Sequence, residues 1–211
     1  MLDVIASPLI SKSDFDAACD ELSRLFAERH NLQSEWLSVD VHDRNDTRFL
    51  RIMKPLCTRV DVALGDSQEQ SDERELMEYD EEALEPSPSH QGVVVEYDIV
   101  FSPSFQVPVL YFNIKDLLFR FPPTMDTLYR HLIPLQFRSQ AEKAGVIGGI
   151  TLTDHPLTNA PVFFVHPCQT VSILGASRGK EELTPIEFLM LWISAMGGCV
   201  GLHLPIALAE K

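Results

Sequence analysis

The first apolar pattern along the chain has the period of a helix. Apolar side chains recur three and four residues apart, at Phe15, Ala18, Cys19, Leu22, Leu25 and Phe26. This spacing places them on one helical face. Ser11 or Ser13 is a suitable N-cap, and Asp14 favours the positive end of the helix. We therefore predict a helix from this cap to about Arg29, with its apolar stripe in the core.

Six later segments have the composition of strands, because they mix β-branched and aromatic residues between turn residues. They are residues 35–41, 48–53, 92–101, 105–112, 150–153 and 162–165. The fourth contains Pro108, which cannot donate a hydrogen bond to a neighbouring strand. We therefore expect this strand at an edge of the sheet or at a bulge.

Two further helices are predicted towards the C-terminus. Residues 126–137 have a helical pattern, but Pro134 should interrupt it. Thr184 precedes Pro185 and Glu187 as in a capping box, and an apolar run over 188–193 follows. Helix, strands and helices in this order indicate an α+β fold, with helices packed on one face or at the ends of an antiparallel sheet.

The charge of the chain is concentrated in one segment. The 211 residues fit a single domain, and the formal net charge is −14. Residues 66–85 hold ten acidic residues and one base, Arg74, which accounts for −9 of that charge. We expect 65–91 to be a flexible surface insertion, with an acidic docking site for a basic partner as the alternative. The acidic balance argues against binding to nucleic acid or to anionic membranes.

Residues 188–209 contain no Asp, Glu, Lys or Arg. An uncharged segment of this length could form a transmembrane helix. Gly197, Gly198 and Pro205 interrupt the run and no basic cluster flanks it, so we predict a buried helix that ends at the glycines. The four cysteines form no C-x-x-C pair, and no signal peptide is recognisable. We expect a cytoplasmic protein in a reducing compartment, without a zinc site or other cofactor.

The candidate chemistry lies in the segment that begins with His166, Pro167 and Cys168, directly after the apolar run 161–165. A strand that stops at a proline delivers the next side chain to a rim, where a thiol can reach a large partner. Such a thiol can hold an acyl group as a thioester. The alternative is an inert buried cysteine, as we expect for the other three, which are Cys19, Cys57 and Cys199.

Three segments together resemble the autophagy-related protein ten family, the conjugating enzymes of a ubiquitin-like autophagy modifier. They are residues 104–112, residues 150–170 with the His-Pro-Cys motif, and residues 192–205. The Gln-Val-Pro-Val-Leu-Tyr-Phe strand at 106–112 favours this family over a sister conjugating enzyme of the same pathway that shares the His-Pro-Cys core.

The resemblance implies a ubiquitin-conjugating-enzyme-like fold, with a curled antiparallel sheet and helices on one face. It implies that Cys168 receives the modifier, autophagy-related protein twelve, from its activating enzyme, autophagy-related protein seven. The modifier then passes to a lysine of autophagy-related protein five during autophagosome formation, so the enzyme acts in the cytoplasm and transiently at the pre-autophagosomal membrane.

Transfer from a thioester needs a hydrogen-bond donor for the developing oxyanion. Ordinary ubiquitin-conjugating enzymes carry His-Pro-Asn, and that Asn is missing here because the motif is His-Pro-Cys. His166, Tyr111, Thr170, Asn113 or backbone N–H groups are the candidate donors or orienting groups. Tyr111 is otherwise a packed aromatic residue, and His166 is otherwise a residue that orients the loop.

Two other functional classes stay open at this point. A non-catalytic adaptor would keep the fold and bind partners through strand edges and the acidic segment. A cysteine hydrolase would activate Cys168 through His166 or His155, and it would need a third group to orient that base.

Overall fold

The computed structural model describes residues 9–56, 92–137, 149–177 and 183–210. Cys57 and the acidic insertion predicted at 65–91 lie outside the described residues.

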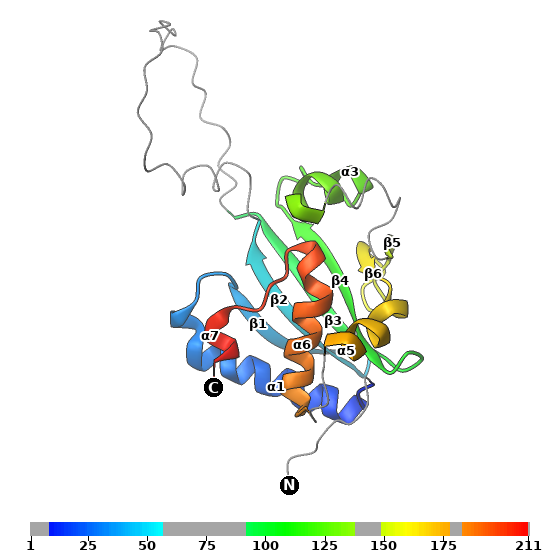
Figure 1. The fold of residues 1–211 in the computed structure, drawn as a ribbon. Coiled ribbons are helices and arrows are strands. Elements are labelled where there is room, and N and C mark those ends of the chain that lie inside the picture. The colour runs from blue at the N-terminus through cyan, green and yellow to red at the C-terminus, as the bar shows by residue number, and fades with distance from the viewer. Residues whose placement is uncertain (1–8, 57–91, 138–148, 178–182, 211) are drawn as a thin grey trace, which may run out of the picture.

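Six strands form one sheet in the order β1-β2-β3-β4-β6-β5, and each neighbouring pair is antiparallel (Figure 1). The strands are β1 (Ser38–Arg44), β2 (Thr47–Pro55), β3 (Val94–Ser102), β4 (Val107–Lys115), β5 (Ile150–Asp154) and β6 (Pro161–Val165). The six predicted strands are therefore confirmed, each displaced by a few residues at its ends.

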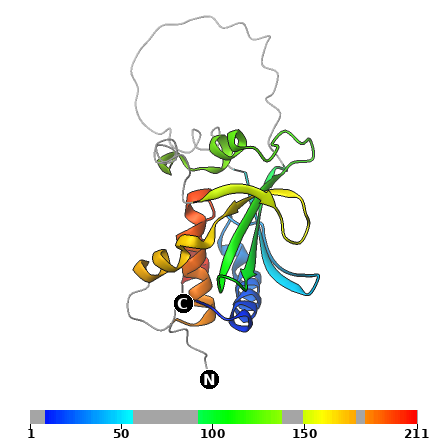
Figure 2. The same cartoon turned by 90° about the vertical axis from the view of Figure 1, so that its right-hand side faces the viewer.

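The helices gather on one face of this sheet, as the two views in Figures 1 and 2 show. They are α1 (Lys12–Arg29), α5 (Thr170–Ser177), α6 (Pro185–Gly197) and the short α7 (Ile206–Ala209). The main core lies between them and the sheet, where Phe15, Leu50, Phe112 and Trp192 are all buried. The predicted α+β architecture, with helices on one face of an antiparallel sheet, is confirmed.

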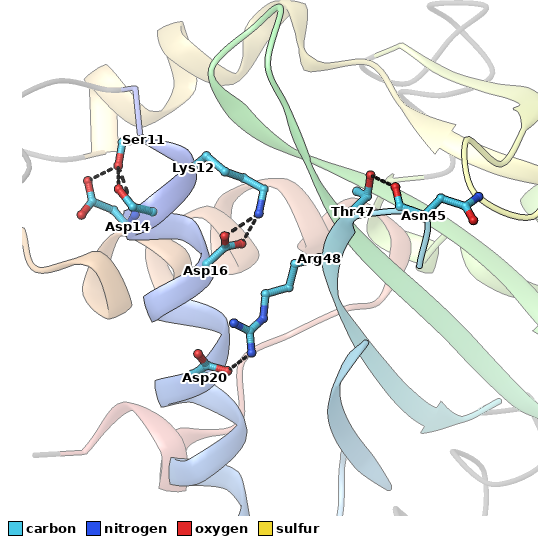
Figure 3. Close-up of polar contacts among 9 residues, drawn as sticks. Ser11, Lys12, Asp14, Asp16, Asp20, Asn45, Thr47 and Arg48 are labelled. Atoms are coloured by element: carbon cyan, nitrogen blue, oxygen red, sulfur yellow. Dashed lines mark hydrogen bonds and ion pairs between the residues drawn. The ribbon is translucent and has the colours of Figure 1, made fainter. Parts of the chain in front are cut away.

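Both predicted helix caps are present. The Ser11 hydroxyl accepts a hydrogen bond from the Asp14 N–H (Figure 3). At the start of α6 the Thr184 hydroxyl accepts from the Glu187 N–H, and the Glu187 carboxylate accepts from the Thr184 N–H. Arg48 of β2 forms an ion pair with Asp20, which ties the first helix to the sheet (Figure 3).

The two prolines differ in outcome: the position of Pro108 departs from expectation, whereas Pro134 interrupts its helix as predicted. Pro108 does not mark an edge strand, because β4 pairs with β3 on one side and with β6 on the other. The β6 pairing spans only Leu110–Phe112, so Pro108 lies where β4 has no β6 residue opposite it. Before Pro134 the chain forms only α3 (Met125–Thr127) and a π-turn over Leu128–Leu132, because Pro disfavours helical backbone at the preceding residue.

The second face of the sheet carries a smaller apolar cluster. Phe49, Val100 and Leu157 are buried there, and Tyr111 packs against them. Leu157 belongs to the segment between β5 and β6, which folds over this face. Within the parts of the chain that the structure describes, no helix has the length and apolar character to cross a membrane.

Candidate active site

Cys168 lies on a short turn that joins β6 to α5. The 3-10 helix Pro167–Gln169 follows β6 and continues into α5 at Thr170. His166 caps this turn, since its Nδ1 accepts a hydrogen bond of 3.0 Å from the Cys168 N–H. The Cys168 side chain is exposed, so the prediction of a thiol at a rim is confirmed.

The His166 ring is held from several directions. It makes edge-to-face contacts with Phe164 and with Phe105, whose ring centroids lie 5.7 Å and 5.8 Å from its own. The backbone N–H of His166 donates to the Gly149 carbonyl at 3.0 Å, which fixes the main chain beneath the ring. Because Nδ1 accepts from Cys168, the proton of the neutral ring lies on Nε2. The ring therefore orients the cysteine turn and has a donor left at Nε2.

The other described cysteines are less suited to nucleophilic chemistry. Cys19 is buried in α1, and burial strongly raises the pKa of its thiol. Burial also raises the pKa of the partly buried Cys199. A thiol with a raised pKa forms little of the reactive thiolate. The expectation that Cys19 is a structural residue is confirmed.

Tyr111 lies on β4 directly opposite Phe164 of β6, and their rings are 5.3 Å apart. Burial raises the pKa of its phenol, so the hydroxyl stays protonated and can donate. No described residue accepts a hydrogen bond from this hydroxyl. The Phe164 ring stands between Tyr111 and His166 in one row of rings, so the two candidates share a surface without direct contact.

Thr170 is not placed to serve a substrate. Its side chain is fully buried, and its hydroxyl lies 3.9 Å from the Met196 sulfur of α6. The interpretation of Thr170 as a donor is therefore wrong, because packing of α5 on α6 withdraws the hydroxyl into the core. Asn113 lies further from the cysteine turn than Tyr111, and its side-chain oxygen accepts from the Ile114 N–H.

His155 has a larger structural role than the sequence indicated. The sequence offered it as a candidate base for a hydrolase, yet the residue is 2% exposed and its ring lies 5.2 Å from the Tyr111 ring. Its Nδ1 accepts from the Leu157 N–H, and its Nε2 lies 3.1 Å from the Asp98 carboxylate. The sequence held one signal for this role. His155 is followed by a proline at the end of a strand, as His166 is at the cysteine turn.

The geometry does not support a hydrolase. Nδ1 of both His155 and His166 is already an acceptor for backbone N–H groups. Within the described residues no carboxylate contacts His166 to orient it as a base, which that chemistry requires. Those residues also contain no cluster of three His, Cys, Asp or Glu side chains arranged to hold a metal ion.

The chain that carries this cysteine turn is similar to known proteins over most of its length. Residues 14–207 match the family described as "Autophagocytosis associated protein, active-site domain". The chain belongs to this family. In an alignment of 235 positions that covers 97% of each chain, it is 36% identical to the ubiquitin-like-conjugating enzyme ATG10 of Gibberella zeae.

More distant relatives carry the same name. The human ubiquitin-like-conjugating enzyme ATG10 is 29% identical over 135 residues, which cover 61% of this chain and 58% of the human one. The Dictyostelium discoideum enzyme is 27% identical over 129 residues, or 56% and 55% of the two chains. These matches confirm the resemblance to the autophagy-related protein ten family that the sequence motifs indicated.

Proposed function

We propose that this chain is a ubiquitin-like-conjugating enzyme in which Cys168 carries the modifier as a thioester. The observation that carries the proposal is an exposed cysteine on a turn that His166 holds through the Cys168 N–H. The family assignment and the relatives named ubiquitin-like-conjugating enzyme support the same reaction class.

The reaction has two acyl transfers. The Cys168 thiolate attacks the carbonyl carbon of the modifier's C-terminal glycine, which is bound as a thioester to the activating enzyme. The new C–S bond forms first and the carbonyl oxygen becomes an oxyanion; this tetrahedral intermediate then breaks the old C–S bond, and the activating enzyme's thiolate leaves. A neutral lysine amine of the acceptor then attacks the Cys168 thioester, gives a proton to solvent water and forms an amide, and the Cys168 thiolate leaves.

Each transfer passes through an oxyanion that needs a donor. The Nε2–H of His166 and the protonated Tyr111 hydroxyl are the side-chain donors that the geometry leaves available. We assign His166 first to holding the cysteine turn, because its Nδ1 is already bonded there. Tyr111 lies beyond the Phe164 ring, so we assign its hydroxyl as a donor that orients the docking acceptor rather than as a donor to the oxyanion on Cys168.

The partners follow from the family resemblance. We assign the modifier as autophagy-related protein twelve, the activating enzyme as autophagy-related protein seven, and the acceptor as autophagy-related protein five. These assignments place the enzyme in the cytoplasm, with transient action at the pre-autophagosomal membrane.

The test mixes the chain with modifier, activating enzyme and ATP and follows the products on a non-reducing gel. We expect a band heavier by one modifier that disappears with thiol. It should be lost in Cys168→Ala and kept in the matched control Cys199→Ala, and Cys168→Ser should trap an ester that resists thiol. A charged activating enzyme that gives no adduct with the wild-type chain would overturn the proposal in favour of a non-catalytic adaptor.

A further inference from the structure

A charged cluster in which Asp98 and His155 are buried lies on the sheet face opposite the helices, next to Tyr111. Arg51 of β2 donates to both Asp98 carboxylate oxygens at 2.7 Å. Asp98 of β3 is 4% exposed, and His155 lies against its other side. Removing charges from water is costly, and a buried ion pair adds little stability over apolar packing. This suggests that the cluster serves another purpose.

The cluster fixes the orientation of the His155 ring. Nδ1 accepts from the Leu157 N–H at 3.1 Å, so the proton of the neutral ring is on Nε2. Nε2 lies 3.1 Å from Asp98 Oδ2, although its alignment falls outside hydrogen-bond geometry, so this contact is chiefly electrostatic. Burial alone would raise the pKa of Asp98, but its contacts with Arg51 and His155 hold the pKa below the usual value. The carboxylate thus stays charged beside the ring.

A row of aromatic rings connects His155 to the cysteine turn. His155 meets Tyr111 edge-on at 5.2 Å, and Tyr111 meets Phe164 at 5.3 Å. Phe164 meets His166 at 5.7 Å, and His166 accepts from the Cys168 N–H. Each ring rests on a neighbour whose own position is fixed by the sheet or by hydrogen bonds. A shift of His155 therefore has a direct packing path to Tyr111.

We propose that His155, held by Asp98 and Arg51, is a positioning residue that sets the Tyr111 ring for the transfer of the modifier from Cys168 to the acceptor lysine. This inference rests on the proposed roles of Cys168 and Tyr111. A hydroxyl without a fixed partner is useful as a donor only if its ring is held, and small displacements of such groups lower rates steeply.

The test is a single-turnover discharge assay. The chain is charged with modifier on Cys168, ATP is removed, acceptor is added, and loss of the thioester is timed. We expect His155→Asn to slow discharge about tenfold, because Asn can still accept from the Leu157 N–H but leaves the Tyr111 ring unsupported. Tyr111→Phe keeps the ring, removes the hydroxyl, and should slow discharge to a similar degree.

The deciding measurement is the double variant. If His155 acts by placing the Tyr111 hydroxyl, the double variant discharges no more slowly than the slower single variant. If the two effects multiply, or if His155→Asn discharges at the wild-type rate while Tyr111→Phe is slow, the positioning role is overturned. Wild-type discharge by Tyr111→Phe would instead overturn the donor role of Tyr111, and failure of the wild-type chain to charge would overturn the proposed function.

Two controls separate positioning from folding. Ile52 of β2 is fully buried in the main core between the sheet and the helices, on the face of the sheet away from His155 and Tyr111. Ile52→Val should lower the melting temperature and leave the discharge rate within about twofold of wild type, as expected for a core residue that contacts neither ring. Should His155→Asn fail to fold, Asp98→Asn serves instead, because it loosens the ring without removing it. We expect it to slow discharge by about threefold, and only when the Tyr111 hydroxyl is present.

Discussion

His155 and His166 occupy the same position in two copies of one turn. In each, a histidine follows a strand and precedes a proline, and its Nδ1 accepts from the backbone N–H two residues later. The bonds are 3.1 Å to Leu157 and 3.0 Å to Cys168. His155 and Leu157 are buried in the first turn, whereas Cys168 is exposed in the second. The same turn therefore covers the sheet face at one place and exposes the thiol at the other.

The first prediction concerns the cap on the cysteine turn. His166→Ala removes the acceptor for the Cys168 N–H, and loss of such a cap costs about 1 kcal/mol. His166→Asn supplies another acceptor at this position and should retain most of that stability. We expect thermal unfolding to rank the proteins as wild type, then Asn, then Ala, and charging of Cys168 to slow in the same order. Equal stability of the Ala and Asn variants would contradict the capping role.

The second prediction concerns the residue behind His166. Gly149 has a φ of +80°, and a Cβ there would lie 3.0 Å from the His166 Cβ. Gly149→Ala should therefore destabilise the protein by about 1–2 kcal/mol and slow charging, because the turn must shift. Chemical denaturation measures the first effect and the thioester gel the second.

Gly175 of α5 is the matched control for this substitution, because a Cβ there would meet nothing within 4 Å. Gly175→Ala should raise the free energy of unfolding by about 0.5–1 kcal/mol, as expected for alanine in a helix. If both variants had the same stability, the close approach at Gly149 would not be what makes that position sensitive.

The third prediction concerns acid stability. The pKa of Asp98 is lowered in the folded protein, so the unfolded chain binds a proton at higher pH than the folded chain does. The stabilisation is present above the ordinary value of 3.8 and is lost as the pH falls below it. Asp98→Asn should unfold more easily at neutral pH and show a shallower loss of stability below that value. Parallel stability–pH curves for the two proteins would contradict the assignment.

The fourth prediction concerns thiol reactivity. We expect iodoacetamide near pH 8 to label Cys168 before Cys19 and Cys199, because Cys168 is exposed and burial raises the pKa of the other two thiols. Peptide mass spectrometry on a Cys57→Ser background would follow the three described thiols. The order should disappear in denaturant, and labelling of Cys19 at the rate of Cys168 in the folded protein would contradict the structure.

Local features were predictable from the sequence because each depends on residues close together in the chain. Ser11 and Thr184 cap their helices through N–H groups three residues away. The strands were visible as short runs of β-branched and aromatic residues, and the proline after His166 indicated that Cys168 would lie at a rim. The acidic insertion at 65–91 stays a prediction, since it lies outside the described residues.

Tertiary structure decided the features that join distant segments. The strand order places β4 between β3 and β6, which Pro108 alone had argued against. Packing of α5 on α6 buried Thr170 against Met196. Arg51, Asp98 and His155 come from three separate segments and meet only because β2 and β3 pair and the segment after β5 folds over them. No local sequence pattern predicts this cluster, because the free energy of forming it depends on strand pairing and burial rather than on residues that are neighbours in the chain.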